Sequence, residues 1–465
     1  MNVTKRIAEY VVHTGLEDFP PEALTAAKGA IIDCLGCMLA GSREPLADIL
    51  CEFIGDSGGR PAASVVGRGF KASAPEAALV NGAMGHALDY DDITRAMKGH
   101  PSVALLPGTL ALAEEAGLAG RELLLAYMLG FEVACSVGES VSAGYYDDLG
   151  WHPTGPLGAL GAAAAASRIL KLDEIQTAMA VSLAASQAAG LRQNFGTMTK
   201  PFHAGASARA GVTAAKLAKA GFTASLDAIE GRFGFLHAFS GGAGYAEERA
   251  LQTLGKRCFL VESGVEIKKY PCCGSAHLAL DATHRLMRRE KVAPEQLDAV
   301  EVMVDFDPPR SLIHSRPKTA LEGKFSMQYC LAAVLLDGQV GLGTFTDQQV
   351  LRPEAQALIP KVSMRRIPGY EGQPSWVEAY NEVDLRFKDG RVVRERSERI
   401  TKGALRGVTI GDIHLKFKDC AFPVLPEPAA QELLELLDGL EDLPDIRPVA
   451  DRLRGDARPN ASRRG

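Results

Sequence analysis

Apolar residues recur every three to four positions along most of the chain, which is the spacing of helices that bury one face. Proline stands at the start of several of these segments, where a helix tolerates it best. The pattern up to about residue 262 predicts one all-α domain. Its expected helices run over about 21–41, 75–88, 111–116, 121–138, 156–170, 174–189 and 206–220.

The spacing changes after about residue 265. Residues 300–304 alternate apolar and polar, as in a half-buried strand. Residues 383–393 contain Asp389-Gly390 at a turn and predict a hairpin. Helical spacing returns at 426–440. We therefore expect a large all-α domain at 1–265 that is completed by helices at about 400–450, a smaller α+β domain at 266–399, and a disordered tail at 454–465.

Composition excludes several classes of protein. With 465 residues, 46% of them hydrophobic, the chain can bury a large core. Its 51 Lys and Arg against 57 Asp and Glu give a net charge of −6, which argues against a nucleic-acid partner. The charged N-terminal segment does not resemble a secretory signal, and no long uncharged apolar run suggests a membrane span. We therefore expect neither a nucleic-acid nor a membrane partner.

The cysteines and the search for known cofactor motifs bear on the location of the protein and on its cofactors. Nine cysteines are scattered along the chain without a secretory context, so reduced thiols and a cytoplasmic location are expected. Cys34 and Cys37 form a CxxC inside a helical pattern, with no second pair at zinc spacing. The sequence has no phosphate-binding glycine motif and no HExxH. We therefore expect no cofactor and no metal.

Three acids follow the helix expected at 75–88. Asp89, Asp91 and Asp92 lie within four positions, and His100 follows in a His-Pro-Ser step. Carboxylates are seldom buried without a partner, so such a cluster needs compensating groups. The alternatives are a solvated acidic loop and a metal site, although the spacing is not that of an EF-hand.

Two further groups of polar residues flank expected helices. His152 precedes an alanine-rich helix whose N-terminus would suit a carboxylate, although a lone histidine is more often structural. Arg192, Thr199, Lys200 and His203 share a stretch that glycines interrupt, which predicts a loop between two helices. So many donors in a connector indicate an anion cradle.

The last two groups lie in the second half of the chain. Lys268 and Lys269 precede Cys272 and Cys273, where the α+β domain is expected to begin. A solvated lysine pair is the alternative. Tyr329 opens an apolar helical segment, where a tyrosine is more often part of the core.

Six segments together resemble the MmgE/PrpD family in their order and spacing. They are NGAMGHALDYDD, GHPS, GWHPTG, TMTKPFHAG, KKYPCC and FSMQYCLAAVLLDG, and the resemblance covers about residues 5–425. The family includes 2-methylcitrate dehydratases, cis-aconitate decarboxylases and iminodisuccinate epimerases. The resemblance implies a large all-α domain completed by C-terminal helices, a smaller α+β domain, a cofactor-free site in the cleft between them, and a homodimer.

The resemblance also implies a set of site residues. Two departures stand out: the decarboxylase pattern has threonine where this chain has Ile93, and histidine where it has Cys273. Both departures remove a polar group from the implied pocket. The matched positions are Asp89 in DxDD, His100 in HPS, His152 in GxH, Lys200 in TKP, Lys268 in KxxP, and Tyr329 in the segment that opens with Phe-Ser.

The activities of this family share proton transfer at a carbon next to a carboxylate, which places negative charge on an enediolate-like group. Cationic side chains would hold the carboxylates, histidines tuned by Asp89 would move protons, and Tyr329 would donate or relay. Asp89 is an alternative base. The expected clamps are Lys200, Lys268 and Arg192, the expected proton carriers are His100 and His152, and further substrate contacts are expected from Thr199, His203 and Cys273.

The sequence therefore predicts a cofactor-independent lyase, either a dehydratase or a decarboxylase, which acts on a small di- or tricarboxylate. An epimerase of a dicarboxylate such as iminodisuccinate is the alternative within enzymes. A non-catalytic, carboxylate-binding helical scaffold is the alternative outside them. Convergence of the predicted residues in one pocket would separate an enzyme from a scaffold.

Overall fold

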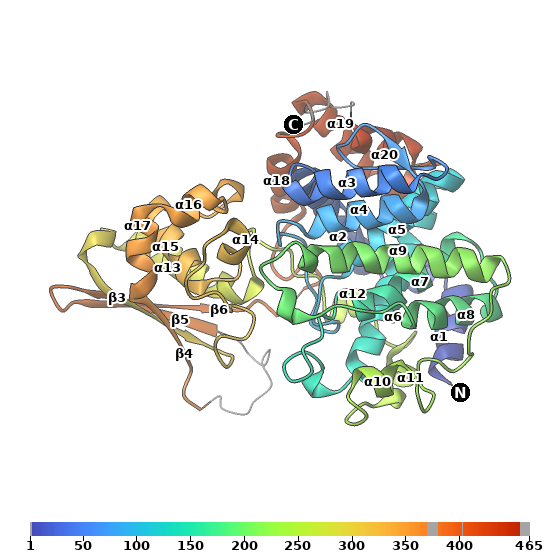
Figure 1. Ribbon diagram of the computed structural model, residues 1–465, viewed down its shortest axis with the longest axis horizontal. Coiled ribbons are helices and arrows are strands. Elements are labelled where there is room, and N and C mark those ends of the chain that lie inside the picture. The colour runs from blue at the N-terminus through green and yellow to red at the C-terminus, as the bar shows by residue number, and fades with distance from the viewer. Residues whose placement is uncertain (1, 370–379, 402, 456–465) are drawn as a thin grey trace.

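The computed structural model describes residues 2–369, 380–401 and 403–455. Figure 1 shows two bodies of unequal size, and the structure is predominantly helical, as predicted. The larger, which we call the helical body, contains α1 (Val3–His13), α2 (Pro21–Gly41), α3 (Pro45–Ser57), α4 (Ala74–His86), α5 (Pro101–Ala116), α6 (Gly120–Ser140), α7 (Pro156–Ile169), α8 (Glu174–Ala185), α9 (Thr199–Lys219), α10 (Phe235–Phe239), α11 (Glu247–Thr253), α12 (Phe259–Glu262), α18 (Ile410–Ala421), α19 (Glu427–Asp438) and α20 (Arg447–Arg454).

The smaller body, which we call the sheet body, holds one mixed sheet covered by helices on one face (Figure 1). Its strand order is β4-β3-β5-β6, with β3 and β4 parallel and the other pairs antiparallel. The predicted strand and hairpin are confirmed as β3, β5 and β6. The elements of this body are α13 (His277–Arg289), α14 (Ala320–Gly323), α15 (Met327–Asp337), α16 (Asp347–Leu351), α17 (Pro353–Leu358), β3 (Leu297–Val304), β4 (Val362–Arg366), β5 (Tyr380–Phe387) and β6 (Val392–Glu398).

Each body has its own apolar core. The core of the helical body includes Ile413 and Phe417 of α18, packed with residues of α2. The core of the sheet body draws on α13, α15 and the strands. The exact domain boundaries at 265 and 399 stay predictions. The tail expected at 454–465 falls outside the described residues from 456 onward, while Arg454 ends α20.

Two core helices, α2 and α6, are long and apolar enough to cross a membrane. Each helix contains an 18-residue apolar stretch, of which 83% in α2 and 94% in α6 is buried inside the protein. Neighbouring helices therefore cover their apolar surfaces in this structure.

The start of α9 differs from the sequence expectation. Lys200 and His203, expected in a loop, lie in its first turns, where Pro201 is tolerated. Gly205 lies inside the helix because α9 packs closely on α4: a Cβ on Gly205 would lie 2.0 Å from the Leu79 carbonyl oxygen. This close packing brings the start of α9 to the end of α4.

Candidate active site

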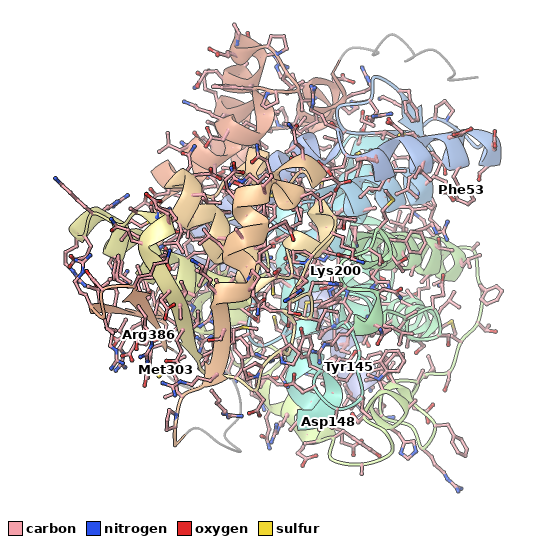
Figure 2. The ribbon with its side chains drawn as sticks, turned by 60° about the vertical axis from the view of Figure 1, so that its left-hand side comes forward. Phe53, Tyr145, Asp148, Lys200, Met303 and Arg386 are labelled. Carbon is pink, nitrogen blue, oxygen red and sulfur yellow. The ribbon has the colours of Figure 1, made fainter. Side chains whose placement is uncertain are left out.

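Several segments of the chain meet at one pocket between the two bodies. The end of α4, the starts of α5, α7 and α9, and the segment that follows residue 267 all reach it. Figure 2 labels Lys200 where the helices of the two bodies meet. The pocket is lined by six of the predicted residues and by Ile93: Asp89, His100, His152, Lys200, Lys268 and Cys273.

Asp89 is buried between two lysines. Its Oδ1 lies 2.6 Å from Lys200 Nζ and 3.1 Å from Lys268 Nζ. Although burial favours the neutral acid, the two ammonium groups hold the pKa of Asp89 below its ordinary value. The backbone φ of Asp89 is 50°, in the left-handed region that aspartate visits more readily than most residues. Asp89, Lys200 and Lys268 thus form a buried cluster of one carboxylate and two cations.

The other two acids of the cluster have different partners. Asp91 lies 2.9 Å from both His86 Nδ1 and His100 Nδ1. Burial opposes its charge, but the two imidazoles hold the pKa of Asp91 well below its ordinary value. Asp92 instead accepts a hydrogen bond from Ser102 Oγ at 2.7 Å. All three acids are buried, so the alternative of a solvated acidic loop is wrong.

His86 connects this pair to Lys200. Lys200 Nζ lies 2.8 Å from His86 Nε2, while His86 Nδ1 faces Asp91. Burial lowers the pKa of His86 to about 3, so this imidazole is neutral at pH 7. The neutral tautomer that donates from Nδ1 to Asp91 and accepts from Lys200 at Nε2 satisfies both contacts.

His152 presents the ring nitrogen that is available for chemistry. Its Nδ1 lies 3.1 Å from His203 Nδ1, and its buried Nε2 has no hydrogen-bond partner in the described part of the chain. Burial, reinforced by the charge of Lys200, holds the pKa of His152 well below its ordinary value. The pKa of His203 is lowered to about 4. Both imidazoles are therefore neutral at pH 7.

Four predicted residues do not line the pocket, and one of them, His203, reaches it only through its contact with His152. Tyr329 is buried in the core of the sheet body, and its hydroxyl donates to the Thr344 carbonyl at 2.6 Å. Arg192 donates to the Tyr146 and Arg310 carbonyls and stacks over the Tyr146 ring, so it supports the pocket wall from behind. Thr199 is exposed. Tyr329 thus belongs to the core of the sheet body, Arg192 supports Tyr146 in the pocket wall, and Thr199 faces solvent.

Replacing Tyr329 with phenylalanine tests whether this residue serves the core of the sheet body and not the reaction. Because the hydroxyl serves one hydrogen bond to Thr344, we expect the free energy of unfolding to fall by about 1 kcal/mol, with kcat and KM unchanged. Denaturant unfolding and steady-state kinetics measure the two effects. A tenfold lower kcat in a folded variant would show instead that Tyr329 takes part in the reaction.

Sequence reasoning missed several residues around the pocket. His86 was quoted within its motif but not assigned to the site. Tyr146 and Ser311 line the pocket, and the Tyr146 hydroxyl lies 2.6 Å from Ser311 Oγ. They belong to different bodies, 165 positions apart, so no local pattern could have linked them.

The histidines and acids also satisfy the spacing of a metal site. Ligand atoms of His86, Asp89, Asp91 and His100 lie within 4.8 Å of one another. However, Lys200 Nζ lies 2.8 Å from His86 Nε2 and 2.6 Å from Asp89 Oδ1. An ammonium group between two ligands competes with a cation for the same electron pairs. The donor set therefore fits a metal poorly while Lys200 is charged.

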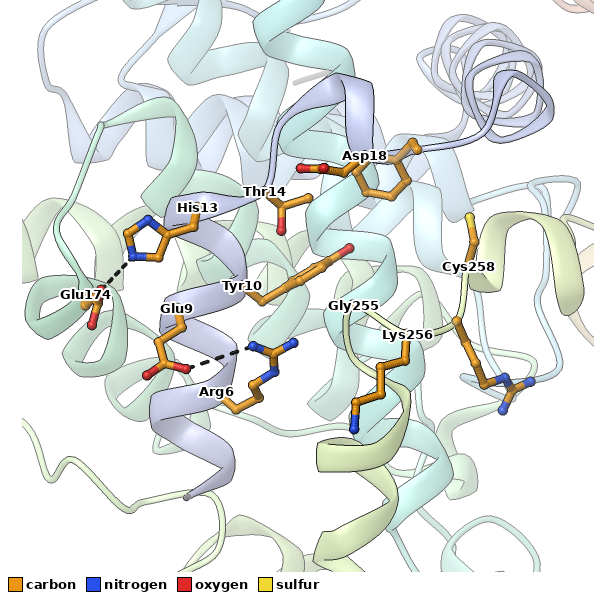
Figure 3. Close-up of a pocket in the computed structure, with 12 residues that line it drawn as sticks. Arg6, Glu9, Tyr10, His13, Thr14, Asp18, Glu174, Gly255, Lys256 and Cys258 are labelled. Carbon is orange, nitrogen blue, oxygen red and sulfur yellow. Dashed lines mark hydrogen bonds and ion pairs between the residues drawn. The ribbon is translucent and has the colours of Figure 1, made fainter.

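A larger groove, of about 640 Å³, lies elsewhere on the helical body. Figure 3 shows its lining, which includes Arg6, Tyr10 and Lys256. Its histidine, His13, is exposed and lies 2.7 Å from Glu174. The perturbed, buried groups described above belong to the smaller pocket, which we therefore take as the candidate active site.

Comparison with known proteins shows the family of the chain. A model of the MmgE/PrpD N-terminal domain matches residues 5–248, and a model of the MmgE/PrpD C-terminal domain matches residues 270–442. The chain belongs to the MmgE/PrpD family. The resemblance recognised from six sequence segments is thus confirmed.

Curated members of the MmgE/PrpD family match nearly the whole chain. The cis-aconitate decarboxylase of Mus musculus is 29% identical over 467 residues, which cover 98% of this chain and 94% of the mouse protein. The cis-aconitate decarboxylase of Aspergillus terreus is 29% identical over 475 residues, which cover 97% of this chain and 96% of that protein. Together with the family match, these relatives indicate that the chain is a lyase.

Proposed function

We propose that this chain is a cofactor-independent lyase that decarboxylates a small, unsaturated di- or tricarboxylate. The observation that carries the proposal is the convergence of two buried ammonium groups, a buried carboxylate and neutral histidines in one pocket. A non-catalytic scaffold would not need this arrangement. The similarity to cis-aconitate decarboxylases makes cis-aconitate the first substrate to test.

Substrate carboxylates would bind to the two lysines. Lys200 and Lys268 share one carboxylate, Asp89, so a second anion beside them is electrostatically favourable. Apolar side chains line the same pocket, among them Ile93, Phe195 and Phe325, and the two phenylalanine rings lie 5.2 and 5.1 Å from Lys200 Nζ. A substrate that joins carboxylates to a short hydrocarbon segment fits a pocket lined by both kinds of group.

The reaction follows from these contacts. When the bond to the departing CO₂ breaks, its electron pair spreads through the adjacent double bond into a neighbouring carboxylate. The developing negative charge lies next to Lys200 and Lys268. The carbanionic carbon then takes a proton, which we assign to Nε2 of His152, while His203 passes its Nδ1 proton to His152 Nδ1 and regains one from solvent, so that both imidazoles end neutral. That assignment requires the tautomer in which His203 donates from Nδ1 to His152 Nδ1.

A panel of carboxylates tests the proposal. The pure protein is incubated in deuterated water with cis-aconitate, 2-methylcitrate and iminodisuccinate, and products are read by NMR. Decarboxylation predicts loss of CO₂ and one deuteron incorporated at carbon. Loss of water instead would show a dehydratase, and exchange with inversion would show an epimerase. No turnover of any of these would overturn the proposed activity.

Chelation tests the cofactor independence. Since Lys200 lies between His86 and Asp89, we expect EDTA followed by gel filtration to leave kcat unchanged. Turnover and metal content are measured on the same sample. Loss of activity that one divalent cation restores would make these residues metal ligands.

A further inference from the structure

Three consecutive carbonyl groups at the pocket each accept a hydrogen bond from a different buried lysine. Lys324 Nζ donates to the Leu88 carbonyl at 3.1 Å, and Lys268 Nζ donates to that of Asp89 at 2.8 Å. Lys416 Nζ donates to the carbonyl of Tyr90 at 2.7 Å. Charged donors make stronger hydrogen bonds than neutral ones, so these bonds fix the backbone on both sides of Asp89.

Two of these lysines also hold the segment that carries Lys268. Lys416 Nζ donates to the Lys268 carbonyl at 3.0 Å, and Lys324 Nζ donates to the Pro271 carbonyl at 3.2 Å. Each lysine therefore ties the Asp89 segment to the Lys268 segment. Neither Lys324 nor Lys416 lines the pocket.

Lys416 is buried, and burying an ammonium group costs free energy unless a partner compensates its charge. It is 8% exposed and lies on α18, where its ammonium is 2.6 Å from Asp33 Oδ1 of α2. It also lies 3.8 Å from the centre of the Tyr90 ring. An unpaired ammonium would be expensive at this depth, and Asp33 compensates its charge.

We propose that Lys416 and Lys324 are positioning residues, which hold Asp89 and Lys268 in register so that the carboxylate and the ammonium face the substrate together. The unusual backbone of Asp89, with φ of 50°, is stabilised by bonds to the carbonyls on either side of it. The inference rests on the proposed function, because it assigns the two lysines a part in the same reaction.

The test compares Lys416→Met and Lys324→Met with the wild type. Displacing catalytic groups by about 1 Å costs roughly 10²-fold in rate, so we expect kcat to fall by that order, with a smaller change in KM. Lys28→Met is the matched control. Lys28 also joins α2 to the C-terminal helical region, through Glu441 at 2.9 Å, but does not reach the site. Its kcat should match the wild type.

A double variant separates positioning from stability. Lys416→Met leaves Asp33 buried without its cation, which can destabilise the fold. Asp33→Asn/Lys416→Met removes that charge, so its unfolding midpoint should return toward the wild type while kcat stays low. Recovery of kcat along with stability would overturn the proposal.

Amide hydrogen exchange gives a readout that does not depend on turnover. In both lysine variants we expect faster exchange at 88–92 and 268–273 than in the wild type, with α6 unchanged. If the wild type turns over no carboxylate, the proposed function fails, while this exchange still tests the positioning. Unchanged exchange in both segments, with kcat unchanged, would reject the positioning role.

Discussion

Replacing His152 with glutamine is expected to lower kcat by about 10²- to 10⁴-fold, with little change in KM, as is typical for loss of a general acid or base. The reason is that His152 Nε2 is buried in the pocket without a partner among the described residues. Steady-state kinetics on the substrate that the panel identifies measures both constants.

Two controls accompany this variant. His13→Gln changes an exposed histidine in the groove of Figure 3 and should leave kcat unchanged. Circular dichroism must show that the His152 variant keeps its helices. A folded His152→Gln protein with full turnover would show that the proton comes from another group.

Replacing Lys200 with methionine is expected to lower kcat/KM by about 10²- to 10³-fold, the usual cost of removing one charge-stabilising donor. Both constants should change, because the ammonium contacts the bound carboxylate and also the charge that develops during reaction. Lys216→Met, on the exposed end of the same helix α9, is the control. An altered KM with unchanged kcat would limit Lys200 to binding.

The same lysine predicts a pH dependence. Burial, with Lys268 nearby, lowers the pKa of Lys200 from its ordinary value of 10.5. The charged form binds the carboxylate, so its contribution is lost as pH rises through this lowered pKa. Substrate affinity should therefore weaken at a lower pH than for an ordinary lysine. Lys200→Arg, whose guanidinium stays charged, should move this loss to higher pH.

Proline marked the beginning of some expected helices, whereas the start of α5 was wrong: this helix begins at Pro101, before the expected segment at 111–116. Pro21 and Pro156 each open a helix at the expected position. The start of α9 was wrong because Gly205 was read as an interruption, whereas it allows close approach to α4. A sequence alone does not distinguish a glycine that breaks a helix from one that lets two helices touch.

The site was predicted to the extent that its residues lie in short motifs. Asp89, His100 and Lys200 stand in such motifs, and the structure brings them to one pocket. The partnership of Lys416 with Tyr90 spans 326 positions and follows from how α18 packs, which no motif records. Tyr329 shows the converse, since a residue within a motif can serve the core.

The packing of α18 against α2 has a consequence for synthesis of the chain. Residues near 31 and 417 share one core, so a nascent chain cannot close this core until α18 has left the ribosome. Apart from Phe195, the described core residues of the sheet body lie between 272 and 387. They are therefore all translated before α18. Until α18 has left the ribosome, the apolar surface of α2 that it will cover stays open to other chains and to chaperones. A helix that is translated late, α18, thus completes a core to which the much earlier helix α2 belongs.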